Sequence, residues 1–149
     1  MNNELNTLTI KEAVEGLQSK KFSSAELTQA CLEQIEKLNL EINAFLTINE
    51  HAISEAKKAD EQRAAGSNSP LLGIPIGLKD MYLTKGLKTT GASHVLENYI
   101  PQYVASVVRK LKVSGAVILG KLNHDAWAHG ASGENSDFGP TKNPWNTEY

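Results

Sequence analysis

The chain has 149 residues, of which 40% are hydrophobic and 21% charged, with a formal net charge of −2 and a single cysteine. This length suffices for one compact domain with a core, and the mildly acidic balance lacks the basic excess typical of a chain that itself binds nucleic acid. No apolar run approaches the roughly 18 residues that a membrane span requires, and the first ten residues lack the basic and apolar regions of a signal peptide. We therefore expect a cytoplasmic protein.

The first 69 residues indicate a mainly helical segment. Thr9 and Ser23 each precede a glutamate by three residues, which is the pattern of a capping box, and apolar residues recur at helical spacing after both. Cys31 lies on the apolar stripe of the second helix, so we interpret it as a small buried hydrophobic residue. The elements predicted here are a helix that starts after Thr9, a helix over 24–39, a strand over 44–48 and a helix over 50–65.

Residues 70–149 indicate the start of an α/β core. The stretch 71–80 predicts a strand, 102–115 an amphipathic helix, and "AVILG" at 116–120 a strand buried on both faces. Strand, helix and strand in this order form a βαβ unit, which is normally parallel and right-handed. We expect the helix to face the core through Val104, Val107, Val108 and Leu111. The predicted fold class is α/β, with N-terminal helices followed by the start of a mixed, largely parallel sheet flanked by helices.

The last stretch, 129–149, is rich in Gly, Ser, Asn and Pro and has hardly any apolar periodicity. An unsupported loop of this length is uncommon in a compact domain and is more often functional. A natural protein seldom ends on such a segment just after starting a parallel sheet, so we expect the chain to be part of a longer protein.

Two common kinds of site find little support. His124 and His129 are five residues apart, which does not place them on one helix face, and the other histidines have no carboxylate or cysteine at ligand spacing, so we predict no metal site. "GASGENSDFG" lacks the glycine spacing of a dinucleotide fingerprint or of a P-loop. We therefore expect no cofactor on this chain.

Lys79, in "GIPIGLKDMY", has two interpretations. It can be an ordinary strand-end lysine whose head reaches water or pairs with Asp80, which the local sequence alone favours. It can also be a desolvated lysine whose lowered pKa makes it a base able to activate a serine hydroxyl. Lys121 and Asp125, just after the second strand, are interpreted as surface residues or as residues that support a site from behind, and not as catalytic groups.

The whole sequence decides between these interpretations. "GIPIGLKDMYLTKGLKTTGAS" and "AVILGKLNHDAWAHGASGENSDFGPTKNPWN" resemble the amidase signature family in order and spacing, from about residue 8 to the last residue. The resemblance implies that 1–149 is the N-terminal part of a single amidase domain, with 1–69 as a helical prelude and 70–149 as the first part of the core. It implies a Ser–cis-Ser–Lys triad whose lysine is Lys79, and a cleft lined by 129–135.

The same resemblance places both serines of the triad and the oxyanion loop beyond residue 149. Three serines of this chain do not occupy the triad positions: Ser93, Ser132 and Ser136. The 149 residues alone are therefore expected to be inactive, and loosely packed or poorly soluble.

Within the family, "TKGLKTTGAS", "GENS" and "FGPTKNPWN" are most similar to the glutaminase subunits of tRNA-dependent amidotransferases. This implies release of ammonia from glutamine to convert Glu-tRNA(Gln), or also Asp-tRNA(Asn), in a heterotrimer with subunits B and C. The first of these two partners would use ATP and magnesium and would bind the tRNA, so this chain itself would hold no cofactor. Two alternatives stay open: a stand-alone amidase of the same family, or a non-catalytic interaction piece if 149 residues is the natural length.

Overall fold

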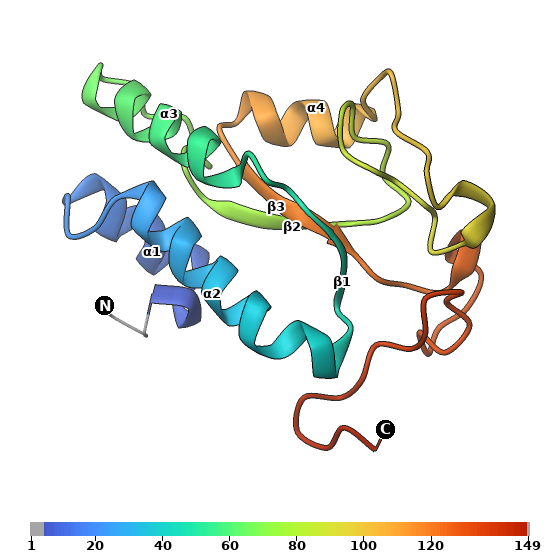
Figure 1. Cartoon of the computed structure of the whole chain (residues 1–149). Coiled ribbons are helices and arrows are strands. Elements are labelled where there is room, and N and C mark those ends of the chain that lie inside the picture. The colour runs from blue at the N-terminus through green and yellow to red at the C-terminus, as the bar shows by residue number, and fades with distance from the viewer. Residues whose placement is uncertain (1–4, 149) are drawn as a thin grey trace.

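The computed structural model describes residues 5–148 as a mixed α/β fold (Figure 1). The helices and strands, in chain order, are the 3-10 turn η1 (Leu5–Thr7), α1 (Ile10–Gln18), α2 (Ser24–Ile42), β1 (Phe45–Ile48), α3 (Ala52–Ala64), β2 (Pro75–Lys79), the 3-10 turn η2 (His94–Leu96), α4 (Ser106–Val113), β3 (Val117–Leu122) and the 3-10 turn η3 (Ala126–Ala128). Every helix and strand predicted from the sequence is present, with boundaries shifted by a few residues. No helix in this part of the chain is long and apolar enough to cross a membrane.

The three strands form one sheet in the order β1-β3-β2. β2 pairs with β3 in parallel, which confirms the predicted βαβ unit, and β1 pairs with β3 in the antiparallel sense. β3 is therefore the central strand, and its residues from Val117 to Lys121 are all buried, as predicted for a strand covered on both faces. The strand from the helical first half thus joins the same sheet as the two strands of the second half.

Helices cover both faces of the sheet (Figure 1). On one face, α2 and α3 enclose Val117 together with the buried alanines Ala52 and Ala56. On the other face, Val108 of α4 packs against Leu78 of β2 and Ile118 of β3. The neighbouring residues Val117 and Ile118 thus serve opposite cores because side chains alternate along a strand.

Local signals account for the helix ends. Thr9 and Ser23 form complete capping boxes with Glu12 and Glu26, as predicted. α2 continues three residues beyond the predicted end at residue 39, because its stop is Asn43, in the left-handed conformation that asparagine tolerates.

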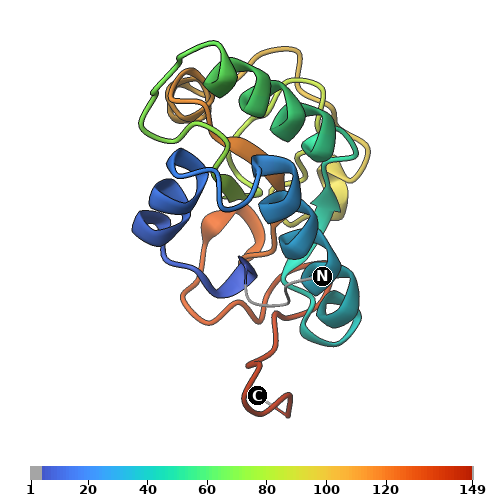
Figure 2. The same ribbon diagram turned by 90° about the vertical axis from the view of Figure 1, so that its left-hand side faces the viewer.

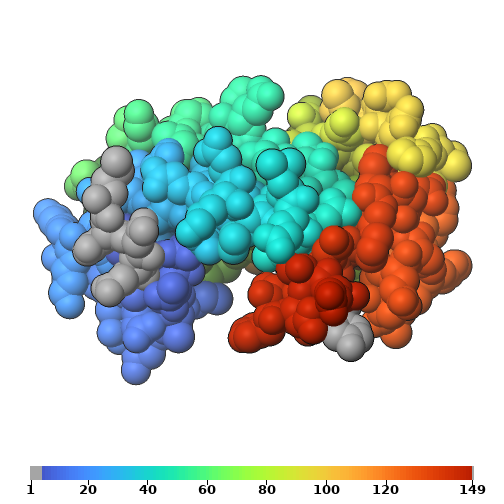
Figure 3. All heavy atoms as spheres, turned by 60° about the horizontal axis from the view of Figure 1, so that its bottom comes forward, coloured from blue at the N-terminus to red at the C-terminus, as the bar shows by residue number. Residues whose placement is uncertain are grey.

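The side chain of Asn43 also donates hydrogen bonds to the carbonyls of Phe138, at 2.9 Å, and Gly139, at 3.1 Å. It thereby ties the C-terminal segment to the end of α2, and the two lie in contact in Figure 3. Beyond this contact the segment extends away from the helices and sheet (Figure 2).

Two details of burial differ from the predictions. Val107 was expected to face the core but is 42% exposed, whereas Val108 is fully buried. The inward face of α4 is set by Val104, Val108 and Leu111, and Val107 lies about 100° around the helix from Val108. Cys31 is half-buried instead of enclosed, and burial raises the pKa of its thiol.

Candidate active site

Lys79 is the last residue of β2 and its side chain is exposed. Its backbone is fixed: Lys79 pairs with Leu122 in the β3 register, and its carbonyl accepts a hydrogen bond of 3.0 Å from the Tyr82 amide. Among residues 5–148, no hydrogen bond or ion pair engages the Lys79 ammonium. The carboxyl end of a parallel strand pair is where α/β sheets place their sites, so Lys79 stands in a suitable position for chemistry.

Asp80 does not pair with Lys79. Its Oδ1 lies 3.1 Å from Nζ of Lys121, and both of these side chains have no exposed surface. Its Oδ2 accepts hydrogen bonds from the Thr90 amide, at 2.8 Å, and from the Thr90 hydroxyl, at 2.5 Å. The interpretation of Lys79 and Asp80 as a surface ion pair is therefore wrong, because Asp80 points into the core towards a different lysine.

Lys121 is not a surface residue, contrary to one of the two interpretations made from the sequence. Besides the ion contact with Asp80, its Nζ donates hydrogen bonds to the Tyr82 carbonyl, at 2.9 Å, and to Thr89 Oγ1, at 2.7 Å. Burial lowers the pKa of Lys121, and the charge of Asp80 opposes that effect. Three oxygen atoms around one Nζ match the three N–H groups of an ammonium, so we assign the charged form.

The loop after this pair, residues 89–94, is held from two sides. Asp80 binds Thr90 from the core side. From the other side, Oδ2 of Asp137 accepts hydrogen bonds from the Ser93 hydroxyl, at 2.6 Å, and from the His94 amide, at 2.8 Å. These two hydrogen bonds lower the pKa of Asp137. The hydroxyl of Ser93 donates to this carboxylate, which fits the expectation that Ser93 is not the nucleophile.

The same loop contains a strained turn. Gly91 and Ala92 both have positive φ, at 62° and 55°, and their carbonyls accept hydrogen bonds from Trp127, at 2.9 Å, and from the Asp137 amide, at 3.1 Å. Left-handed backbone at a residue other than glycine costs of order 1–3 kcal/mol and persists only where the surroundings determine it. The loop 89–94 is thus rigidly organised beside the end of β2.

Asp125 organises the next loop and is also buried, so it is not a surface residue. Its carboxylate accepts hydrogen bonds from the Gly133 amide, at 3.0 Å, and from the Asn135 amide, at 3.3 Å. A Cβ at Gly130 would lie 2.3 Å from Cγ of Asp125, so only glycine fits there. The "HGASGEN" segment, 129–135, is therefore wrapped closely around this one carboxylate.

His124 is a buried residue of the site that the sequence interpretation left without a role. Its Nδ1 lies 2.6 Å from the Asp125 carbonyl, and its Nε2 is buried with no hydrogen-bond partner among residues 5–148. Burial is the largest cause that lowers the pKa of His124, and the positive charge of Lys79 acts in the same direction. We assign a neutral ring with the proton on Nδ1, since a carbonyl can only accept. Its position two residues after a fully apolar strand was the sequence signal for burial.

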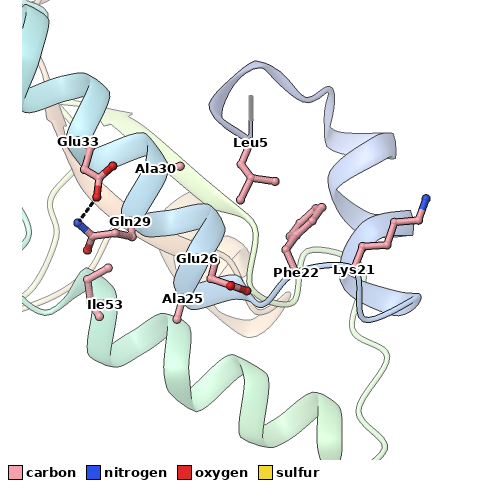
Figure 4. Close-up of a pocket in the computed structure, with 9 residues that line it drawn as sticks. All are labelled: Leu5, Lys21, Phe22, Ala25, Glu26, Gln29, Ala30, Glu33 and Ile53. Carbon is pink, nitrogen blue, oxygen red and sulfur yellow. Dashed lines mark hydrogen bonds between the residues drawn. The ribbon is translucent and has the colours of Figure 1, made fainter. Parts of the chain in front are cut away.

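The hollow drawn in Figure 4 lies elsewhere, in the helical first half of the chain. Its volume is about 400 Å³, and it is lined by Leu5, Lys21, Phe22, Ala25, Glu26, Gln29, Ala30, Glu33 and Ile53. Glu26 is engaged by Ser23 in the capping box, and Gln29 donates to Glu33 at 3.0 Å. None of the charged side chains here is buried, so this hollow has no group prepared for catalysis. Within residues 5–148 no three His, Cys, Asp or Glu side chains are grouped to hold a metal ion.

The chain belongs to the amidase family, whose family model matches residues 26–149. It is 51% identical over 146 residues to the A subunit of the glutamyl-tRNA(Gln) amidotransferase of Geobacter metallireducens and 52% identical over 145 residues to that of Dehalococcoides mccartyi; each match covers 97% of this chain and 30% of the relative. The chain thus spans about 30% of the length of these relatives.

Solved structures agree on the fold. The peptide amidase of Stenotrophomonas maltophilia superposes with a TM-score of 0.89 at 30% identity, over 97% of this chain and 31% of that one. The A subunit of the glutamyl-tRNA(Gln) amidotransferase of Thermotoga maritima superposes with a TM-score of 0.73 at 35% identity, over 97% of this chain and 29% of that one. The resemblance to the amidase signature family, and the fold class expected from it, are therefore confirmed.

Proposed function

We propose that this sequence is part of the glutaminase subunit of a glutamyl-tRNA(Gln) amidotransferase, and that Lys79 is its catalytic base. The observation that carries the proposal is the identity of about half of all residues to these amidotransferase relatives across 97% of the chain. The position of Lys79 supports it, since its unpaired ammonium stands at the carboxyl end of β2 beside the rigid loop 89–94.

The reaction requires Lys79 as a neutral amine. The amine takes a proton, through an intermediate serine hydroxyl, from a second serine whose oxygen attacks the side-chain amide carbon of glutamine. The C–N bond breaks, ammonia leaves with the returned proton, and water hydrolyses the acyl-enzyme to glutamate. Both serines and the donors for the oxyanion belong to parts of the protein outside residues 1–149.

The same proposal extends to the assembly with subunits B and C. The former would activate the tRNA-bound glutamate with ATP and magnesium and would receive the ammonia, and the latter would join the two larger subunits. The net charge of −2 is compatible with a protein that leaves the tRNA to its partner.

The test is ammonia release from glutamine by the complete protein. Lys79→Ala is expected to lower kcat/KM by about 10²- to 10⁴-fold, the usual contribution of a general base, without lowering the thermal midpoint. Lys88→Ala, at an exposed lysine in the same region, is the matched control and is expected to leave the rate unchanged. Full activity of Lys79→Ala would show that Lys79 is structural only.

A second candidate is a stand-alone amidase that acts on another small amide. It is favoured by the higher TM-score to the peptide amidase, 0.89 against 0.73 for the amidotransferase subunit. Release of ammonia from a peptide amide but not from glutamine, without partner subunits, would select this candidate. In either case we expect the 149-residue chain by itself to release no ammonia.

A further inference from the structure

The buried ion pair of Asp80 and Lys121 has a position that matters for its neighbour. Asp80 follows Lys79 directly, yet their side chains leave the strand on opposite faces. A carboxylate so close to an amine stabilises the ammonium form, and it does so more strongly where water is excluded. Asp80 has no exposed surface. Left alone, it would hold a proton on the residue that has to give one up.

The structure gives Asp80 a counter-charge. Lys121 Nζ lies 3.1 Å from Asp80 Oδ1 and is fixed there by the Tyr82 carbonyl and the Thr89 hydroxyl. Neither of those two partners carries a charge. The ammonium of Lys121 is therefore balanced by Asp80 alone, and the pair as a whole is neutral.

We propose that Lys121 is a positioning residue that neutralises Asp80, so that this carboxylate can hold the loop 89–94 without keeping Lys79 protonated. The inference rests on the proposed function, because it presupposes that Lys79 acts as a neutral base. Asp80 is needed for the loop, since its Oδ2 binds both the amide and the hydroxyl of Thr90. Lys121 makes that use of a carboxylate compatible with a base one residue away.

Other titratable groups of the site stay constant in this comparison. On the segment after β3, His124 is neutral, and the carboxylate of Asp125 is engaged by the amides of Gly133 and Asn135. Asp80 on β2 and Lys121 on β3 are the two charges whose removal separates the proposal from a purely structural role.

The experiment measures kcat/KM for ammonia release from glutamine against pH in the complete enzyme. Lys121→Met leaves Asp80 unbalanced and is expected to move the acidic limb upward by about one pH unit. Asp80→Asn leaves the ammonium of Lys121 unbalanced and is expected to move the limb downward. The double variant has neither charge and is expected to return the limb close to its wild-type position. Lys112→Met is the control, because it breaks an ion pair of 3.7 Å between exposed side chains of Lys112 and Glu55 and should shift nothing.

A purely structural pair would lower activity in these variants without moving the limb, and shifts of the same sign in both single variants would also overturn the proposal. If Lys121→Met does not fold, Asp80→Asn and the double variant still differ in their expected limbs. The rate of acylation of Lys79 by acetic anhydride against pH, followed by mass spectrometry, reports the same titration without catalysis. Hence a wild-type enzyme inactive on glutamine contradicts the proposed function, whereas an unshifted Lys79 titration in the variants contradicts this inference.

Discussion

At the scale of single residues, two carboxylates determine the shape of the loop beside Lys79. Asp80 reaches Thr90 from the core, and Asp137 reaches Ser93 and His94 from the outer side. The sequence could place Lys79 at the end of a strand and could suggest its role by resemblance. It could not show that Asp80 and Lys121 meet, because they are 41 positions apart and come together only through the parallel pairing of β2 and β3.

Asp137 has a pH-dependent contribution to stability that can be measured. Hydrogen bonds from Ser93 and His94 lower its pKa in the folded protein. Its contribution is therefore complete above the ordinary aspartate value of about 3.9 and is lost as the pH falls through the lower folded value. We expect Asp137→Asn to lower the thermal midpoint of the complete protein at pH 5–7, with a difference from wild type that shrinks below about pH 4.

Glu134→Gln is the control for this measurement, since Glu134 is exposed and makes no hydrogen bond or ion pair within residues 5–148. A difference between Asp137→Asn and wild type that stays constant down to pH 2 would contradict the role assigned to the carboxylate.

At the scale of elements, periodicity and caps predicted most of what the structure contains. Both capping boxes, the four helices and the three strands were predictable because each is specified by residues close in sequence. The end of α2 was not, because the apolar stripe stops before the helix does and the stop depends on the conformation of Asn43. The exposure of Val107 was missed for a related reason: the inward face of an eight-residue helix depends on its exact rotation against the sheet.

Asn43 combines a backbone role and a side-chain role, and two substitutions separate them. Asn43→Gly keeps the left-handed cap and loses the side-chain hydrogen bonds to Phe138 and Gly139, for which we expect about 1–2 kcal/mol of lost stability. Asn43→Ala loses the same hydrogen bonds and adds the left-handed strain of alanine, about 1 kcal/mol more.

Denaturant unfolding of the complete protein measures the two free energies, and hydrogen exchange of 138–142 shows whether the segment is released. Equal stability of the two variants would show that the conformation of Asn43 is not costly. Unchanged exchange in both would show that the segment is held by other contacts.

At the scale of the whole molecule, the sheet is the feature that leaves surfaces open. β3 is covered on both faces and on both edges, whereas β1 and β2 are edge strands of the three-stranded sheet that the structure describes. Several large apolar side chains lie on the surface, among them Leu40 at 98% exposure, Trp145 at 92% and Val113 at 76%. Open strand edges and exposed apolar side chains are typical surfaces for packing against further structure. The chain also spans only about 30% of the length of its relatives, so such further structure is expected in the complete protein.

The isolated 149-residue chain should therefore be loosely packed or poorly soluble. We expect it to bind a hydrophobic dye such as ANS and to unfold over a broad temperature range, because the three small cores around the sheet are not enclosed on all sides. Leu40→Lys is a matched variant, since it removes one almost fully exposed apolar side chain from α2 without touching a core. It is expected to reduce aggregation and to leave the breadth of the transition unchanged. A sharp, cooperative transition with little dye binding in the unmodified chain would show instead that these 149 residues form a self-sufficient domain, and that its exposed apolar residues are isolated surface features.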